Sequence, residues 1–131
     1  MKHLLTPTSI GEVLDKISIL QIKSERIKDK NKLENVVREL GLLTILCSNQ
    51  GLDFKVPLFD NLKKVNEELW EIEDAIRLKE KAQQFDAEFI SLARSVYITN
   101  DRRARIKGEL NVLFGSDLME EKSYEEYTAK K

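Results

Sequence analysis

The densest group of side chains that could bind a ligand is a run of cations late in the sequence. Arginines and a lysine at 102, 103, 105 and 107 directly follow residues 99–101 (TND), a pattern typical of a helix N-terminus. A helix N-terminus offers free N–H groups and partial positive charge, and so favours anions. We therefore predict an anion site for a phosphorylated sugar or nucleotide, with candidate residues Arg94, Tyr97, Asn100, Arg102, Arg103 and Lys107.

A second candidate is a row of carboxylates. Glu67, Glu71 and Asp74 share one helical face, the spacing at which all-α pyrophosphohydrolases hold magnesium. Apolar residues project from the opposite face, however, and no second pair of this kind follows on a neighbouring helix. We expect these carboxylates to face water, to bind no metal, and to be available as ion-pair partners for the arginines. Such pairing, with these carboxylates or with the acidic segment 116–131, is the alternative to an anion site.

A third group indicates an interface. In a helix expected over residues 10–29, Asp15, Ile19, Ile22 and Arg26 share a face that differs from the main apolar stripe. In the third expected helix, which starts at Pro57, apolar residues from 58 to 76 alternate steps of four and three, as in a coiled coil. Either another helix of this chain or a second subunit could cover these faces. The candidate interface residues are Asp15, Ile19, Ile22, Arg26, Leu62, Leu69 and Ile76.

Composition excludes several classes of function. The chain has one cysteine and one histidine, and no Ser/His/Asp set or glycine-rich phosphate loop. We therefore find no catalytic motif, expect no cofactor, and lean against an enzyme. A net charge of -1 over 131 residues does not suit generic nucleic-acid binding. Neither a signal peptide nor a membrane-spanning segment is indicated, so we expect a cytoplasmic protein.

Helical periodicity runs along almost the whole sequence. It predicts an all-α fold: an antiparallel bundle of about four to five helices with a long central helical hairpin. Helices are expected to start at the capping box of Ser9, at Pro57, at Asp86 and after a break near residues 99–101. Gly115 should end the last helix. We predict one domain over residues 1–131, with 1–8 and 116–131 as flexible or docking termini.

Four segments resemble the DUF6165 family of short bacterial and phage helical proteins of unknown function. They are residues 9–23 (SIGEVLDKISILQIK), 68–77 (ELWEIEDAIR), 93–107 (ARSVYITNDRRARIK) and 121–124 (EKSY). The resemblance covers nearly the whole chain. It implies no activity, but an association with glycosyltransferase and surface-polysaccharide genes. Gly108 departs from the charged or helix-favouring residue expected after the third segment, which weakens a site role there.

Two functions of different class follow from these observations. The first is a helical protein-interaction module, which forms a homodimer or binds another protein. Its interface would be the second face of helix 10–29 or the coiled-coil-like apolar face of residues 58–76. The second is a small-anion binder or enzyme that uses the arginine-rich helix start. Sedimentation distinguishes the first, and ligand screening with and without magnesium the second.

Overall fold

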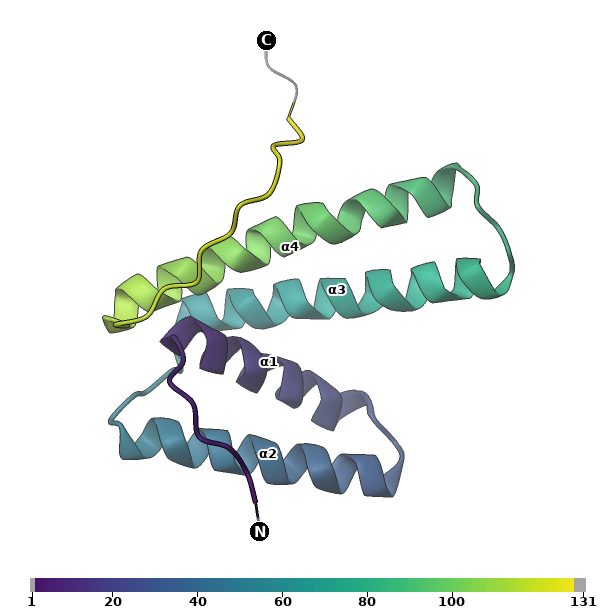
Figure 1. Cartoon of the computed structure of the whole chain (residues 1–131). Coiled ribbons are helices and arrows are strands. Elements are labelled where there is room, and N and C mark those ends of the chain that lie inside the picture. The colour runs from purple at the N-terminus through teal and green to yellow at the C-terminus, as the bar shows by residue number, and fades with distance from the viewer. Residues whose placement is uncertain (1, 129–131) are drawn as a thin grey trace.

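The computed structural model describes residues 2–128, which contain four helices and no strand (Figure 1). They are α1 (Ile10–Arg26), α2 (Lys30–Asn49), α3 (Pro57–Lys81) and α4 (Ala87–Phe114). The expected all-α bundle is confirmed, with α3 and α4 as its long hairpin. Helix α1 packs against all three other helices and lies between α2 and the α3–α4 hairpin (Figure 1).

Local sequence signals set the helix starts. Side-chain oxygens of Ser9, Asp29 and Asp86 each accept a hydrogen bond from the backbone N–H three residues on, at 3.0–3.2 Å. Pro57 occupies the first turn of α3, where a missing N–H costs nothing. Gly115 ends α4 in the left-handed conformation, φ 65°, as expected.

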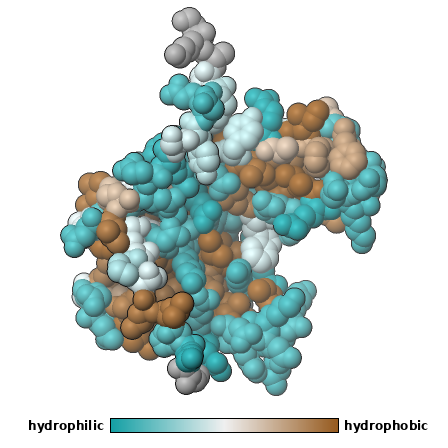
Figure 2. Space-filling view, viewed as in Figure 1, coloured by the Kyte–Doolittle hydropathy of each residue, from teal (hydrophilic) through white to brown (hydrophobic). Residues whose placement is uncertain are grey.

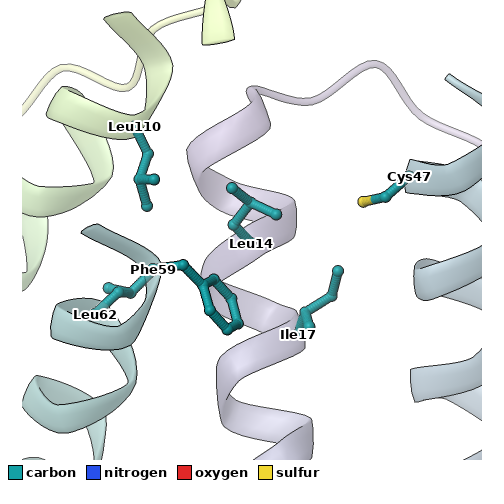
Figure 3. Close-up of a cluster of buried hydrophobic side chains, with 6 residues drawn as sticks. All are labelled: Leu14, Ile17, Cys47, Phe59, Leu62 and Leu110. Carbon is teal, nitrogen blue, oxygen red and sulfur yellow. The ribbon is translucent and has the colours of Figure 1, made fainter. Parts of the chain in front are cut away.

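A core of six buried side chains joins all four helices (Figure 3). Leu14 and Ile17 of α1 lie at its centre. The other four residues come from α2, α3 and α4: Cys47, Phe59, Leu62 and Leu110. Because α1 contributes apolar groups toward several neighbours, it has few positions left for solvent, which explains its excess of apolar faces.

Two predicted boundaries are wrong. The first helix ends at Arg26 rather than at residue 29, because Ile27 is extended and Asp29 already caps α2. No break occurs at residues 99–101, and α4 continues through them. Thr99 is buried there, and tertiary packing overrides the weak local preference of these residues for a helix start.

Apolar side chains are not confined to the core. Val37, Leu42, Ile45 and Leu46 of α2 are each between 45% and 58% exposed. On the side of the molecule seen in Figure 2, apolar residues gather around the C-terminal half of α2. Within residues 2–128, none of the helices has the length and apolar character that a bilayer crossing requires.

Candidate functional site

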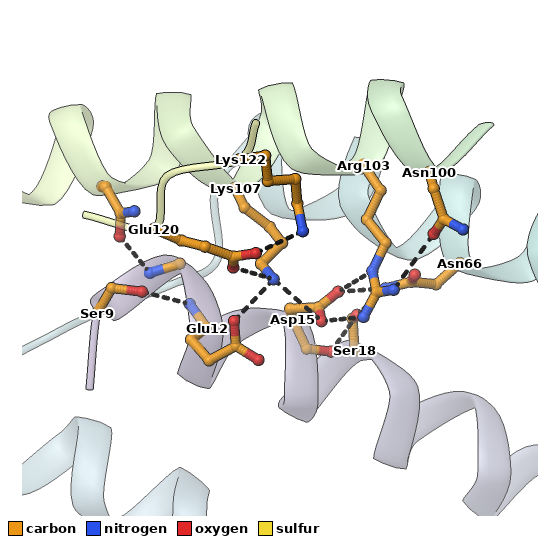
Figure 4. Close-up of polar contacts among 12 residues, drawn as sticks. Ser9, Glu12, Asp15, Ser18, Asn66, Asn100, Arg103, Lys107, Glu120 and Lys122 are labelled. Atoms are coloured by element: carbon orange, nitrogen blue, oxygen red, sulfur yellow. Dashed lines mark hydrogen bonds and ion pairs between the residues drawn. The ribbon is translucent and has the colours of Figure 1, made fainter. Parts of the chain in front are cut away.

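The most unusual group in the molecule is a buried carboxylate. Asp15 lies on α1 where it meets α3 and α4, and only 2% of its surface is exposed. The guanidinium of Arg103 binds it through two nitrogens, with Nε 2.9 Å from Oδ1 and Nη2 in contact with Oδ2 (Figure 4). Such two-pronged pairing is the geometry that best compensates a carboxylate for lost water.

Asn66 and Ser18 complete the surroundings of Asp15. The Nδ2 group of Asn66, on α3, donates to Asp15 Oδ1 at 2.9 Å and to Ser18 Oγ at 2.7 Å. The Ser18 hydroxyl in turn donates to the Asp15 backbone carbonyl at 2.7 Å. These hydrogen bonds tie α1 to α3 as well as to α4.

Lys107 extends this network toward the C-terminal segment, residues 116–128. Its Nζ lies 2.7 Å from Glu12, 3.0 Å from Glu120 and 3.8 Å from Asp15. Lys122 binds the other oxygen of Glu120 at 2.6 Å. Three carboxylates therefore face three cations: Glu12, Asp15 and Glu120 against Arg103, Lys107 and Lys122.

The pKa shifts follow these contacts. The hydrogen bond to Asp15 raises the pKa of Arg103, which keeps its charge. Burial lowers the pKa of Lys107, but hydrogen bonds to Glu12 and Glu120 outweigh it and the net shift is upward. Lys122 and then Lys107 lower the pKa of Glu120 to about 2. Arg103, Lys107 and Glu120 are therefore all charged near neutral pH.

A glycine allows α1 and α4 to approach this closely. A Cβ on Gly11 would stand 2.5 Å from the carbonyl oxygen of Lys107 and 3.0 Å from Asn111 Oδ1. The Gly11 N–H uses the space to donate to Asn111 Oδ1 at 2.6 Å. The first turn of α1 therefore rests on the backbone of α4.

Two pockets flank the network. One, of about 570 Å³, lies between α4 and the C-terminal segment and includes Arg103 and Lys107 in its wall, with three tyrosines: Tyr97, Tyr124 and Tyr127. The other, of about 370 Å³, lies between α1, α3 and α4. Asn100 and Arg103 line both pockets.

The predicted anion-site residues are only partly brought together. Tyr97, Asn100, Arg103 and Lys107 line the larger pocket, whereas Arg94 is exposed on α4 and Arg102 binds Glu68 at 2.8 Å. Because α4 is unbroken, residues 99–101 do not start a helix, and that part of the prediction is wrong. Arg102 and Arg103 form ion pairs with Glu68 and Asp15, which were not among the partners expected from the sequence.

The predicted interface residues mostly face other parts of this chain. Asp15, Ile22 and Leu62 are buried, and Ile19, Leu69 and Ile76 are partly buried. Arg26 binds Glu71 and lies 3.8 Å from Glu67, with its guanidinium 5.6 Å from the centre of the Trp70 ring. Two of the three carboxylates in the predicted row thus pair with Arg26, and residues 2–128 contain no acidic, histidine or cysteine cluster suited to a metal.

Sequence reasoning missed four partners in the network: Ser18, Asn66, Asn111 and Glu120. A signal for part of it was present on α1, where Gly11, Asp15 and Ser18 place small or polar residues at steps of four and three. Such a stripe inside an otherwise apolar helix indicates polar contact with a neighbour. No local signal identifies α4 as that neighbour.

The comparisons with known proteins give one match. The model of a family of unknown function, DUF6165, matches residues 5–130. No curated protein and no solved structure matches the chain.

Proposed function

Because the chain belongs to the DUF6165 family of unknown function, we propose a function from its geometry: a single helical protein-interaction module that pairs with a second copy through α2. The observation that carries this proposal is the exposed apolar face of α2. The family resemblance suggests an accessory role beside glycosyltransferases of surface-polysaccharide synthesis. Such a role needs an adaptor and no catalytic group.

Helix α2 is the least covered of the four. It packs against α1, and Val36 and Cys47 are its buried residues. Its outer face carries Val37, Leu42, Ile45 and Leu46, each about half exposed. Residues 40–52 contain no charged side chain. An uncharged apolar helix face of this kind is typical of a surface that another helix covers.

The α2 face is self-complementary, which favours a second copy as its partner. Val37, Gly41 and Ile45 form one i, i+4 ridge. If two α2 helices cross antiparallel at Gly41, Val37 lies opposite Ile45 of the partner subunit, and the contact repeats by two-fold symmetry. A Cβ at Gly41 has nothing within 4 Å in the single chain, so the glycine leaves space that a partner backbone can enter.

The rival anion-binding function has weaker support. The larger pocket does gather three cations and three tyrosines. Those cations already pair with Glu12, Asp15 and Glu120, so the network carries no net positive charge. An anion would have to displace one of these carboxylates, which the buried geometry of Asp15 opposes.

Sedimentation equilibrium tests the pairing. We expect a dimer at tens of micromolar, and Ile45→Lys should make the chain monomeric while its helical circular dichroism is retained. Val112→Lys is the matched control, since Val112 is 73% exposed on α4 and lies outside the α2 face. A monomeric wild type, or equal effects of the two lysines, would refute the α2 dimer.

Gly41→Leu separates pairing from folding. A side chain at Gly41 meets open space in the single chain, so the variant should fold at least as stably as wild type at submicromolar concentration. In an α2 pair crossing at Gly41, the same side chain blocks close approach. We expect the dissociation constant of the dimer to rise by at least tenfold, measured by sedimentation. An unchanged dissociation constant would exclude this crossing.

A further inference from the structure

The smaller pocket is a cleft between the two helical hairpins. It lies where the second half of α1 diverges from α3 and α4, and Figure 2 shows the molecule hollowed between the α3–α4 hairpin and the end of α1. Its apolar wall is formed by Ile19, Ile22, Leu69 and Trp70. A mostly apolar hollow with a few converging polar groups is the usual form of a small-molecule site.

Asn66 places an unused hydrogen-bond acceptor in this pocket. The side chain is buried, with 5% of its surface exposed, and its Nδ2 group donates to both Asp15 and Ser18. Its Oδ1 accepts no hydrogen bond within residues 2–128. No side-chain oxygen sealed from solvent lacks a partner in that range, so this Oδ1 opens into the pocket that Asn66 lines. A ligand donor could satisfy it.

The charges of the pocket favour a cation. Arg103 also lines it, but the carboxylate of Asp15 neutralises that guanidinium. Glu73 and Asp74 line the outer part. Glu73 has only a distant partner, Arg77 at 3.8 Å, and Asp74 forms no ion pair within the described part of the chain. The pocket therefore has an acidic excess on α3, within four positions of Trp70, whose ring centre lies 5.6 Å from the Arg26 guanidinium.

We propose that this pocket binds a small organic amine that also carries a hydroxyl donor. The apolar body of the amine packs between Trp70, Leu69 and Ile22, and its ammonium group faces Asp74 and Glu73. The hydroxyl donates to Asn66 Oδ1 at the inner end of the pocket. Residues 66 and 74 lie eight positions apart on α3, about 12 Å along its axis, so the two polar groups of the ligand stand at opposite ends of an elongated molecule.

Trp70 is the only tryptophan in the chain, so its indole N–H gives one NMR resonance that reports on this pocket. The probes are tyramine, which has an ammonium group and a phenol, tyrosol, in which a hydroxyl replaces the ammonium, and phenethylamine, which lacks the phenol. We expect tyramine to shift the indole resonance and to bind more tightly than either analogue. Added salt should weaken the binding of tyramine and leave the binding of tyrosol unchanged.

Asp74→Asn tests the role of charge at the site. Asp74 is exposed and unpaired, so the variant should keep the wild-type melting temperature while the dissociation constant of tyramine rises by about twofold to fivefold. Tyrosol binding should not change. Glu80→Gln, an exposed carboxylate further along α3, is the control and should leave both constants unchanged.

Three results would overturn the proposal: no movement of the indole resonance with tyramine, tyrosol binding as tight as tyramine, or equal effects of Asp74→Asn and Glu80→Gln. The site lies away from the α2 face. Ile45→Lys should therefore abolish pairing and leave tyramine binding intact, which separates failure of the amine site from failure of the proposed dimer.

Discussion

At the scale of single residues, the molecule depends on pairs that are far apart in sequence. Asp15 and Arg103 are 88 positions apart, and Gly11 and Asn111 are 100 apart. The sequence predicted that Arg103 binds either an anion or an acidic side chain. It could not identify Asp15, because residue types alone do not specify which helices become neighbours.

Removing the charge of Asp15 should destabilise the fold. Asp15→Asn leaves the partly buried Arg103 cation without its carboxylate, and we expect a loss of about 2–3 kcal/mol in unfolding free energy, below the range for a fully buried pair because Arg103 is 28% exposed. Urea denaturation measures it. Arg103→Gln and the double variant complete a thermodynamic cycle, and strictly additive losses would contradict direct coupling.

Gly11→Ala should be destabilising although alanine favours helices. The added methyl group would meet the Lys107 carbonyl oxygen at 2.5 Å, and backbone cannot move aside as a flexible side chain can. We expect a loss of about 1–3 kcal/mol, measured by urea denaturation. An unchanged or raised stability would show that α1 and α4 are less closely packed than the structure describes.

At the scale of helices, local signals were predictable from the sequence and tertiary contacts were not. The starts at Ser9, Pro57 and Asp86 were predictable, because a cap needs only the residues beside it. The Ser9–Glu12 capping box was half right: Ser9 accepts from the Glu12 N–H, but the Glu12 carboxylate binds Lys107. Tertiary contacts also override the break predicted at residues 99–101, because packing against α1 and α3 keeps α4 continuous.

Gly108→Ala is the matched opposite of the Gly11 substitution. Gly108 lies inside α4, and a Cβ there meets nothing within 4 Å. Alanine should therefore raise the unfolding free energy by about 0.5–1 kcal/mol, because it restricts the unfolded chain and favours the helix. The same urea assay measures it. Destabilisation by Gly108→Ala would indicate that α4 is interrupted near this residue.

At the scale of the whole molecule, Glu120 connects the C-terminal segment to the helices through Lys107. Its folded pKa of about 2 lies below the ordinary 4.5. A carboxyl group whose pKa is lowered by folding stabilises the protein above its ordinary pKa, and this contribution disappears as pH falls toward the folded value. The pH range concerned is therefore about 4.5 down to about 2.

Glu120→Gln should reveal this pH dependence. At neutral pH the variant should be less stable than wild type, by a small amount because the Glu120 side chain is 36% exposed and solvent screens it. The difference should shrink as pH falls from about 4.5 to about 2, and should also shrink in high salt. Thermal melts across this range provide the measurement. A difference that grows toward low pH would contradict the assigned ion pairs.

The long reach of the α1 contacts has a consequence during synthesis. Helix α1 is made first, but the partners of Asp15 and Gly11 belong to α4, the last helix. At about 5–20 residues per second, the 88 residues from Asp15 to Arg103 take on the order of 4–18 s to translate. During that interval the nascent chain holds an apolar helix whose acidic centre has no counterion. Folding of the contacts around α1 is therefore complete only after α4 has been made.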